Sequence, residues 1–90
     1  IGIACIVNTK SVIEHDCIIS DGVHISPSAA LAGGVNVGKK SWVGIGACVK
    51  QLVNIGADAV IGAGSVVIRE IPNHAVVVGN PASLLILNNQ

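Results

Sequence analysis

The chain has 90 residues, a length that suits one domain with a small core, and its formal net charge is zero. It has one aromatic residue, Trp42, and no basic patch, which excludes the usual kind of nucleic-acid-binding surface. Gly, Ser, Asn or Asp interrupts every apolar run before it reaches the length of a membrane span, so we expect no membrane insertion.

The three cysteines, Cys5, Cys17 and Cys48, form no Cys-x-x-Cys pair. An odd number of cysteines without metal-ligand spacing is typical of reduced thiols that pack as small hydrophobes. No basic segment leads into an apolar signal core. We therefore predict a cytoplasmic protein without a metal site.

An aliphatic residue recurs at every sixth position without an insertion. These positions are Ile1, Val7, Ile13, Ile19, Ile25, Leu31, Val37, Val43, Val49, Ile55, Ile61 and Val67. Four residues after each of them stands, in most cases, Ala, Ser or Cys. Neither a helix nor a simple alternating strand repeats in this phase. The pattern predicts a coil of short parallel strands, three to a turn, with the aliphatic side chains inside and residues eighteen apart stacked in columns.

The predicted coils differ in their polar content. Coil one, residues 1–18, contains Glu14-His15-Asp16, the only histidine of the chain that lies between two carboxylates. Coil two, residues 19–36, contains His24 and a pair of glycines. Coil three, residues 37–54, contains Trp42, which we expect to stack in the column of His24. Coil four, residues 55–72, is the most regular of the four.

The repeat is already in phase at Ile1, without an initiator methionine. We therefore expect that the chain is a piece of a longer protein whose upstream part is missing, which would leave an open coil edge. At the other end, proline cannot donate to a β-ladder, so we expect the solenoid domain, residues 1–72, to end at Pro72. Residues 73–90 are then predicted to form a C-terminal capping tail.

His15 is the strongest candidate for chemistry. Transfer of an acyl group from a thioester to an amine or hydroxyl needs a base, and histidine titrates near neutral pH. A carboxylate can fix the tautomer of the imidazole, but strand neighbours such as Glu14 and Asp16 would point to the opposite face. Their help requires a local turn, or a carboxylate from another subunit.

Gly33 follows His15 by eighteen residues and is predicted to stack beside it at about 4.8 Å, the spacing of neighbouring strands. A glycine leaves empty space and an accessible backbone N–H next to the histidine. We expect that space to admit a pantetheine arm, with Gly33 in contact with the thioester oxygen.

These motifs together resemble one enzyme family. The run Asn-Thr-Lys-Ser-Val-Ile-Glu-His-Asp-Cys-Ile at 8–18 is followed by His-Ile-Ser-Pro, Leu-Ala-Gly and Trp-Val-Gly-Ile-Gly-Ala. Over residues 7–83 the sequence resembles the hexapeptide-repeat sugar N- and O-acetyltransferases of the PglD-like and NeuD-like group. The resemblance implies an all-β fold, a left-handed parallel β-helix of about four coils, a hand that the periodicity itself does not give.

The resemblance also implies roles for individual residues. His15 would accept the proton, and Asp16 would tune its basicity. The acceptor, a UDP-linked amino sugar or a sialic acid-type sugar, would lie near Asn8 and Glu14. The remaining residues would contact the co-substrate acetyl-CoA, and these are His24, Gly33, Ile45 and Ala63.

The family assembles as a homotrimer with active sites between subunits. That agrees with the register, because Ile45 and Ala63 stack on each other but on a different face from His15 and Gly33. The chain also departs from the family. The 90 residues do not include the N-terminal sugar-nucleotide-binding domain that the family usually carries, and Ser83 stands where a basic residue often follows Asn-Pro-Ala.

Two other functions remain open. A zinc carbonic anhydrase can use the same solenoid, but that family has two histidines four residues apart plus a third, whereas His15 and His24 are nine apart. The alternative without chemistry is a trimeric β-helix scaffold or fragment.

Overall fold

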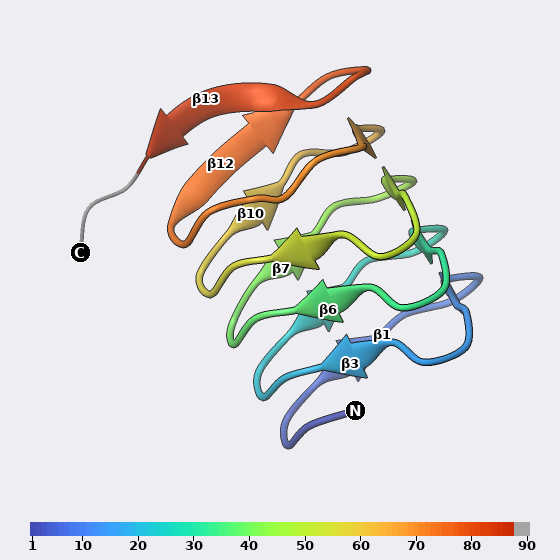
Figure 1. The fold of residues 1–90 in the computed structure, drawn as a ribbon. Helices are drawn as coiled ribbons and strands as arrows, with labels where there is room; N and C mark the ends of the chain where they lie inside the picture. The colour runs from blue at the N-terminus through green and yellow to red at the C-terminus, as the bar shows by residue number, and fades with distance from the viewer. Residues whose placement is uncertain (88–90) are drawn as a thin grey trace.

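The computed structural model describes residues 1–87, which form thirteen β-strands and no helix, so no helix that could cross a membrane occurs in this range. The chain winds as a coil whose successive turns stack on one another (Figure 1). The strands are β1 (Ile6–Val7), β2 (Val12–Ile13), β3 (Ile18–Ile19), β4 (His24–Ile25), β5 (Ala30–Leu31), β6 (Asn36–Val37), β7 (Trp42–Val43), β8 (Cys48–Val49), β9 (Asn54–Ile55), β10 (Val60–Ile61), β11 (Val66–Val67), β12 (Ala75–Val78) and β13 (Ser83–Leu87).

Three sheets form the faces of a prism. Sheet A has the order β1-β4-β7-β10-β12-β13, sheet B the order β2-β5-β8-β11, and sheet C the order β3-β6-β9. Up to β11 every pairing is parallel and joins residues eighteen apart, as Ile6 with His24 and His24 with Trp42. The left-handed parallel β-helix predicted from the repeat and the family is confirmed.

The six-residue period comes from two strand residues plus a four-residue corner. We name the corners by the sheets they join: the AB corners (8–11, 26–29, 44–47 and 62–65), the BC corners (14–17, 32–35 and 50–53) and the CA corners (20–23, 38–41 and 56–59). The third residue of each corner has a positive φ, as in Asp16, Gly34 and Lys40. This left-handed conformation turns the chain from one sheet to the next.

The interior is a stack of aliphatic side chains. Ile25, Leu31, Val43 and Ile61 are fully buried, as the repeat predicted. Ser41, at a corner, is also fully buried, and its hydroxyl donates to the Gly56 carbonyl and accepts from the Ala59 N–H. Small corner residues therefore either fill the narrow edge of the prism or tie one coil to the next.

The last coil is shorter than the others by two residues. Ile71 pairs with Ile55 and Val76 with Val60, so the register changes from eighteen residues to sixteen. The missing residues belong to the corner that joins sheets B and C, where Val35 and Val53 fill the interior in the coils before it. No residue takes that inner position in the last coil, which opens the end of the prism.

The parallel stack does not end at Pro72, contrary to expectation. β12 continues sheet A in parallel with β10, and only β13 turns back, antiparallel to β12. Pro72 follows Ile71 as Gly56 follows Ile55, and the Gly56 N–H donates to the coil after it. Because the N–H that proline lacks would face beyond the last coil, no ladder bond is lost. Residues 88–90 of the predicted tail lie outside the described residues.

The outward columns of the three sheets differ in polarity. Sheet A presents Ile6, His24, Trp42, Val60 and Val76, and sheet B presents Val12, Ala30, Cys48 and Val66. Sheet C presents Ile18, which is 61% exposed, followed by two asparagines, with Asn36 donating to Asn54 at 2.8 Å and Asn54 to Glu70 at 3.4 Å. Two faces are thus largely apolar, and the third carries a polar ladder beyond Ile18.

Candidate functional site

His15 and Asp16 lie together at the first BC corner. The local turn that their interaction requires is present, because Asp16 has a φ of 60°. It brings the Asp16 carboxylate to 3.2 Å from Nδ1 of His15. Both side chains are exposed, at 80% and 89%, so this contact adds little to stability. Its effect is on the tautomer: in the neutral ring, Nδ1–H donates to Asp16 and Nε2 keeps its lone pair.

Gly33 lies directly over the His15 ring, as the register predicted. A Cβ atom at this glycine would be 2.8 Å from both Cε1 and Nε2 of the imidazole. We expected the space over Gly33 to be empty, but the imidazole of His15 itself occupies it. The neighbouring Gly34 donates its N–H to the His15 carbonyl at 2.9 Å, which joins the two corners.

A pocket of about 260 Å³ surrounds this pair. It is lined by His15, Asp16, Gly33, Gly34, Gln51 and Leu52. The sequence analysis did not single out Gln51 or Leu52, although the eighteen-residue register places them over Gly33 and Gly34. Leu52 combines a left-handed φ of 63° with 74% exposure, which is unusual for a large apolar side chain. The pocket thus has one polar side and one apolar side.

Glu14 belongs to the same corner and is exposed. Within residues 1–87 its carboxylate forms no ion pair and no hydrogen bond, so of the two acidic neighbours only Asp16 contacts His15. The carboxylate of Glu14 remains free to meet a ligand.

His24 and Asn8 lie elsewhere, on sheet A and at the AB corner. Nδ2 of Asn8 is 3.0 Å from Nε2 of His24 and donates to the Ile25 carbonyl at 3.2 Å. The predicted stack with Trp42 is present, with ring centroids 4.0 Å apart and ring planes 4° from parallel. The indole N–H donates to the buried hydroxyl of Ser26 at 3.0 Å.

Ile45 and Ala63 occupy successive AB corners and are stacked, since Gly64 donates its N–H to the Ile45 carbonyl. Ile45 is 60% exposed. Sheet B separates these corners from the BC corner of His15 and Gly33. One copy of the chain therefore presents the sequence-predicted site residues in two groups, Asn8, His24, Ile45 and Ala63 in one and Glu14, His15, Asp16 and Gly33 in the other.

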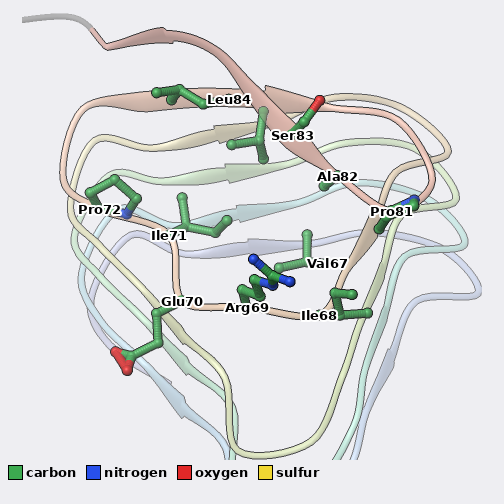
Figure 2. A pocket seen from close by; sticks show the side chains of 11 residues that line it. Val67, Ile68, Arg69, Glu70, Ile71, Pro72, Pro81, Ala82, Ser83 and Leu84 are labelled. Atoms are coloured by element: carbon green, nitrogen blue, oxygen red, sulfur yellow. The ribbon is translucent and has the colours of Figure 1, made fainter.

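A larger pocket, of about 430 Å³, lies at the shortened last coil. Figure 2 shows it between Val67–Pro72 on one side and Pro81–Leu84 on the other, with Arg69 over its centre. None of the sequence-predicted site residues lines it. In residues 1–87 no group of three or more His, Cys, Asp or Glu side chains is placed to hold a metal ion.

The fold and sequence of this chain are similar to those of known acyltransferases. No family model matches the sequence. A variant of perosamine N-acetyltransferase from Caulobacter crescentus, in complex with CoA and GDP-perosamine, superimposes with a TM-score of 0.94 at 44% identity, over 94% of this chain and 40% of that one. The acetyltransferase domain of PglB from Neisseria gonorrhoeae FA1090, in complex with acetyl coenzyme A, gives 0.89 at 43% identity, over 90% and 40%.

Curated sequences agree with the structural matches. Serine acetyltransferase 2 from Arabidopsis thaliana is 40% identical over 85 residues, which is 86% of this chain and 26% of that protein. The chain spans about a quarter of the length of the curated relatives it matches. Its sequence and fold are similar to those of the hexapeptide-repeat acyltransferases.

Proposed function

We propose that this chain is the acyl-transfer part of an acetyl-CoA-dependent sugar acetyltransferase, with His15 as the general base. The observation that carries the proposal is the arrangement of His15: its Nδ1 faces Asp16, and its ring lies in a pocket against Gly33, where a side chain in place of the glycine would displace the ring. The similarity to proteins solved with CoA and acetyl coenzyme A supports acetyl-CoA as the co-substrate.

In the proposed reaction, an amine or hydroxyl of the sugar attacks the carbonyl carbon of the thioester. Nε2 of His15 takes the proton of the attacking group, and Asp16 stabilises the imidazolium that forms. The C–S bond then breaks, and the imidazolium returns the proton to the departing thiolate, so that free CoA and the acetylated sugar are released. The Gly33 N–H, which has no backbone acceptor within residues 1–87, is available for the developing oxyanion.

The acceptor is proposed to be an amino sugar carried on a nucleotide, such as UDP, or a sialic acid-type sugar. The relative solved with GDP-perosamine supports a nucleotide-linked amino sugar. We propose that two side chains contact this acceptor: Glu14, from the group of site residues around His15, and Asn8, from the group around His24.

A homotrimer is proposed because the two groups of site residues lie on different corners of the prism. In such a trimer, sheet A or sheet B of one subunit packs near the BC corner of its neighbour. The first subunit then supplies His24, Ile45 and Ala63 to a cleft whose His15 belongs to the neighbour. The apolar outward columns of sheets A and B suit burial between subunits, and the asparagine ladder of sheet C suits solvent.

Calorimetry with acetyl-CoA on the purified chain, together with its mass in the same buffer, tests the proposal. We expect saturable binding by a trimer with one site per subunit, and transfer to an amino sugar nucleotide detected as release of free CoA thiol. An intact trimer that binds no acetyl-CoA would contradict the proposal and favour a scaffold without catalysis.

A further inference from the structure

The hydrogen bonds of Asn8 determine which nitrogen of His24 carries the proton. Nδ2 of Asn8 lies within hydrogen-bonding distance of two atoms, the Ile25 carbonyl oxygen at 3.2 Å and Nε2 of His24 at 3.0 Å. The carbonyl oxygen can only accept, so the amide must present its NH₂ group on this side. Its second N–H then points at Nε2, which has to accept. In this network the proton of a neutral His24 ring is on Nδ1.

Trp42 holds the plane of the His24 ring. The two rings are nearly parallel and 4.0 Å apart, and the β4–β7 pairing places the two residues side by side in sheet A. The indole is itself fixed by its hydrogen bond to Ser26, whose side chain is buried. Ile6 occupies the position next to His24 on the other side of the column. Only the edge of the imidazole is left open.

The open edge is a hydrogen-bond donor. Within residues 1–87, Nδ1 of His24 has no hydrogen-bond partner, whereas Nε2 is occupied by Asn8. The two histidines therefore present opposite groups: His15 offers a lone pair on Nε2, and His24 offers an N–H on Nδ1. A lone pair accepts a proton from a reacting group, and a neutral N–H binds a carbonyl oxygen.

We propose that Asn8 and Trp42 are positioning residues: they hold His24 as an Nδ1–H donor toward a carbonyl oxygen of the acyl donor, the ligand that the family resemblance already assigns to His24. The choice of ligand rests on the proposed function. It is supported by the surroundings of the Nδ1–H donor, since Ile6 and Trp42, which are 51% and 50% exposed, offer apolar surface to the methylene groups of the acyl donor. Asn8 thereby acts through His24, in addition to any contact of its amide oxygen with an acceptor sugar.

The tautomer can be measured without any ligand. Long-range ¹H–¹⁵N correlation spectra of the histidine-labelled chain should show the proton of neutral His24 on Nδ1. Asn8→Ala removes the donor that faces Nε2, so we expect His24 to become a mixture of both tautomers. Val60→Ala is the control, because it truncates the same outward column one position beyond Trp42 and should leave the His24 signals unchanged. A proton on Nε2 in the unmodified chain would overturn the positioning role of Asn8.

The ligand is tested with acetyl-CoA itself. We expect Asn8→Ala and Trp42→Ala to bind acetyl-CoA about tenfold more weakly, which corresponds to the loss of one well-oriented hydrogen bond. KM for acetyl-CoA should rise in both variants, while kcat changes less. Trp42→Phe keeps an aromatic face over His24, so its affinity should stay within about threefold. Because Trp42 is the only aromatic residue, its emission reports directly on this edge and should change on binding.

The outcomes separate this proposal from the proposed function. If the unmodified chain binds acetyl-CoA but Asn8→Ala and Trp42→Ala bind it equally well, the role of His24 as a positioned donor is wrong and the acyltransferase proposal stands. If the unmodified chain does not bind acetyl-CoA at all, the proposed function and the ligand assigned to His24 both fail. The tautomer spectra decide the positioning role in either case.

Discussion

At the scale of single residues, His15 is a side chain that the fold does not need. Its ring is 80% exposed and contacts only its own corner, Gly33 and Asp16. We predict that His15→Ala lowers kcat by about 10²- to 10⁴-fold, the usual contribution of a general base. The midpoint of thermal unfolding and the affinity for acetyl-CoA should change little. A large fall in thermal stability would show that His15 is a structural residue.

Gly33 depends on His15 in a way that a double-mutant cycle can detect. The second position of a corner tolerates large side chains, as Ile45, Lys39 and Gln51 occupy it in other coils. Gly33→Val should therefore leave the coil intact but displace the His15 ring, because its Cβ would lie 2.8 Å from two ring atoms. We expect a large loss of transfer activity in Gly33→Val.

In a His15→Ala background, Gly33→Val should cost no stability. Denaturant unfolding of the two single variants and the double variant measures this coupling. If Gly33→Val destabilises both backgrounds equally, the glycine is required by the backbone and not by the histidine.

The sequence predicted which site residues stack on one another, but not the contacts that their side chains make. The eighteen-residue register follows from the repeat, so the stacking of His15 on Gly33 and of His24 on Trp42 could be predicted. The contact of His15 with Asp16 could not, since it depends on a left-handed φ at Asp16 that no glycine announces. Leu52 was missed for the same reason: a leucine in that conformation does not follow from turn propensities.

At the scale of strands and corners, the Ser41 side chain links two successive coils. It is fully buried, and its hydroxyl joins the Gly56 carbonyl to the Ala59 N–H. Ser41→Ala leaves both of these groups without a partner, so we predict a loss of about 1–3 kcal/mol in the free energy of unfolding. Ser28→Ala, at an exposed corner position, is the control and should change stability by less than about 0.5 kcal/mol. Equal effects in the two variants would contradict the bridging role of Ser41.

The end of the coil was predicted less well than its beginning. Ile71 fits the six-residue pattern as a small-position residue, but the structure uses it as an inward strand residue beside Ile55. The aliphatic repeat breaks after Val67, since Asn73 takes the next position, but a break in the period does not distinguish a corner shortened by two residues from the end of the coil. Pro72 suggested that the parallel β-ladder ends there, because the sequence does not show that the missing N–H of this proline faces beyond the last coil.

At the scale of the whole molecule, the contrast between the faces predicts which side of the prism associates. Ala30 lies in the outward column of sheet B and Asn36 in that of sheet C, on neighbouring strands of the same coil. We expect Ala30→Lys to convert the proposed trimer to monomers, because a charge would be buried between subunits. Asn36→Lys, the matched change on the polar face, should leave the mass unchanged. Sedimentation velocity distinguishes the two, and a trimer in both variants would exclude sheet B from the interface.

The shortened last coil has a consequence for polymerisation. A regular solenoid has ends that match, and the top of one molecule could template the bottom of the next into a fibre. Here the change to a sixteen-residue register, with β13 folded back along the edge of sheet A, makes the C-terminal end of the coil irregular. Any further coil that aligned with β11 would collide with β13, which occupies the edge of sheet A beyond β12. The corner that is shorter by two residues therefore opposes the stacking of one molecule on the C-terminal end of another into a fibre.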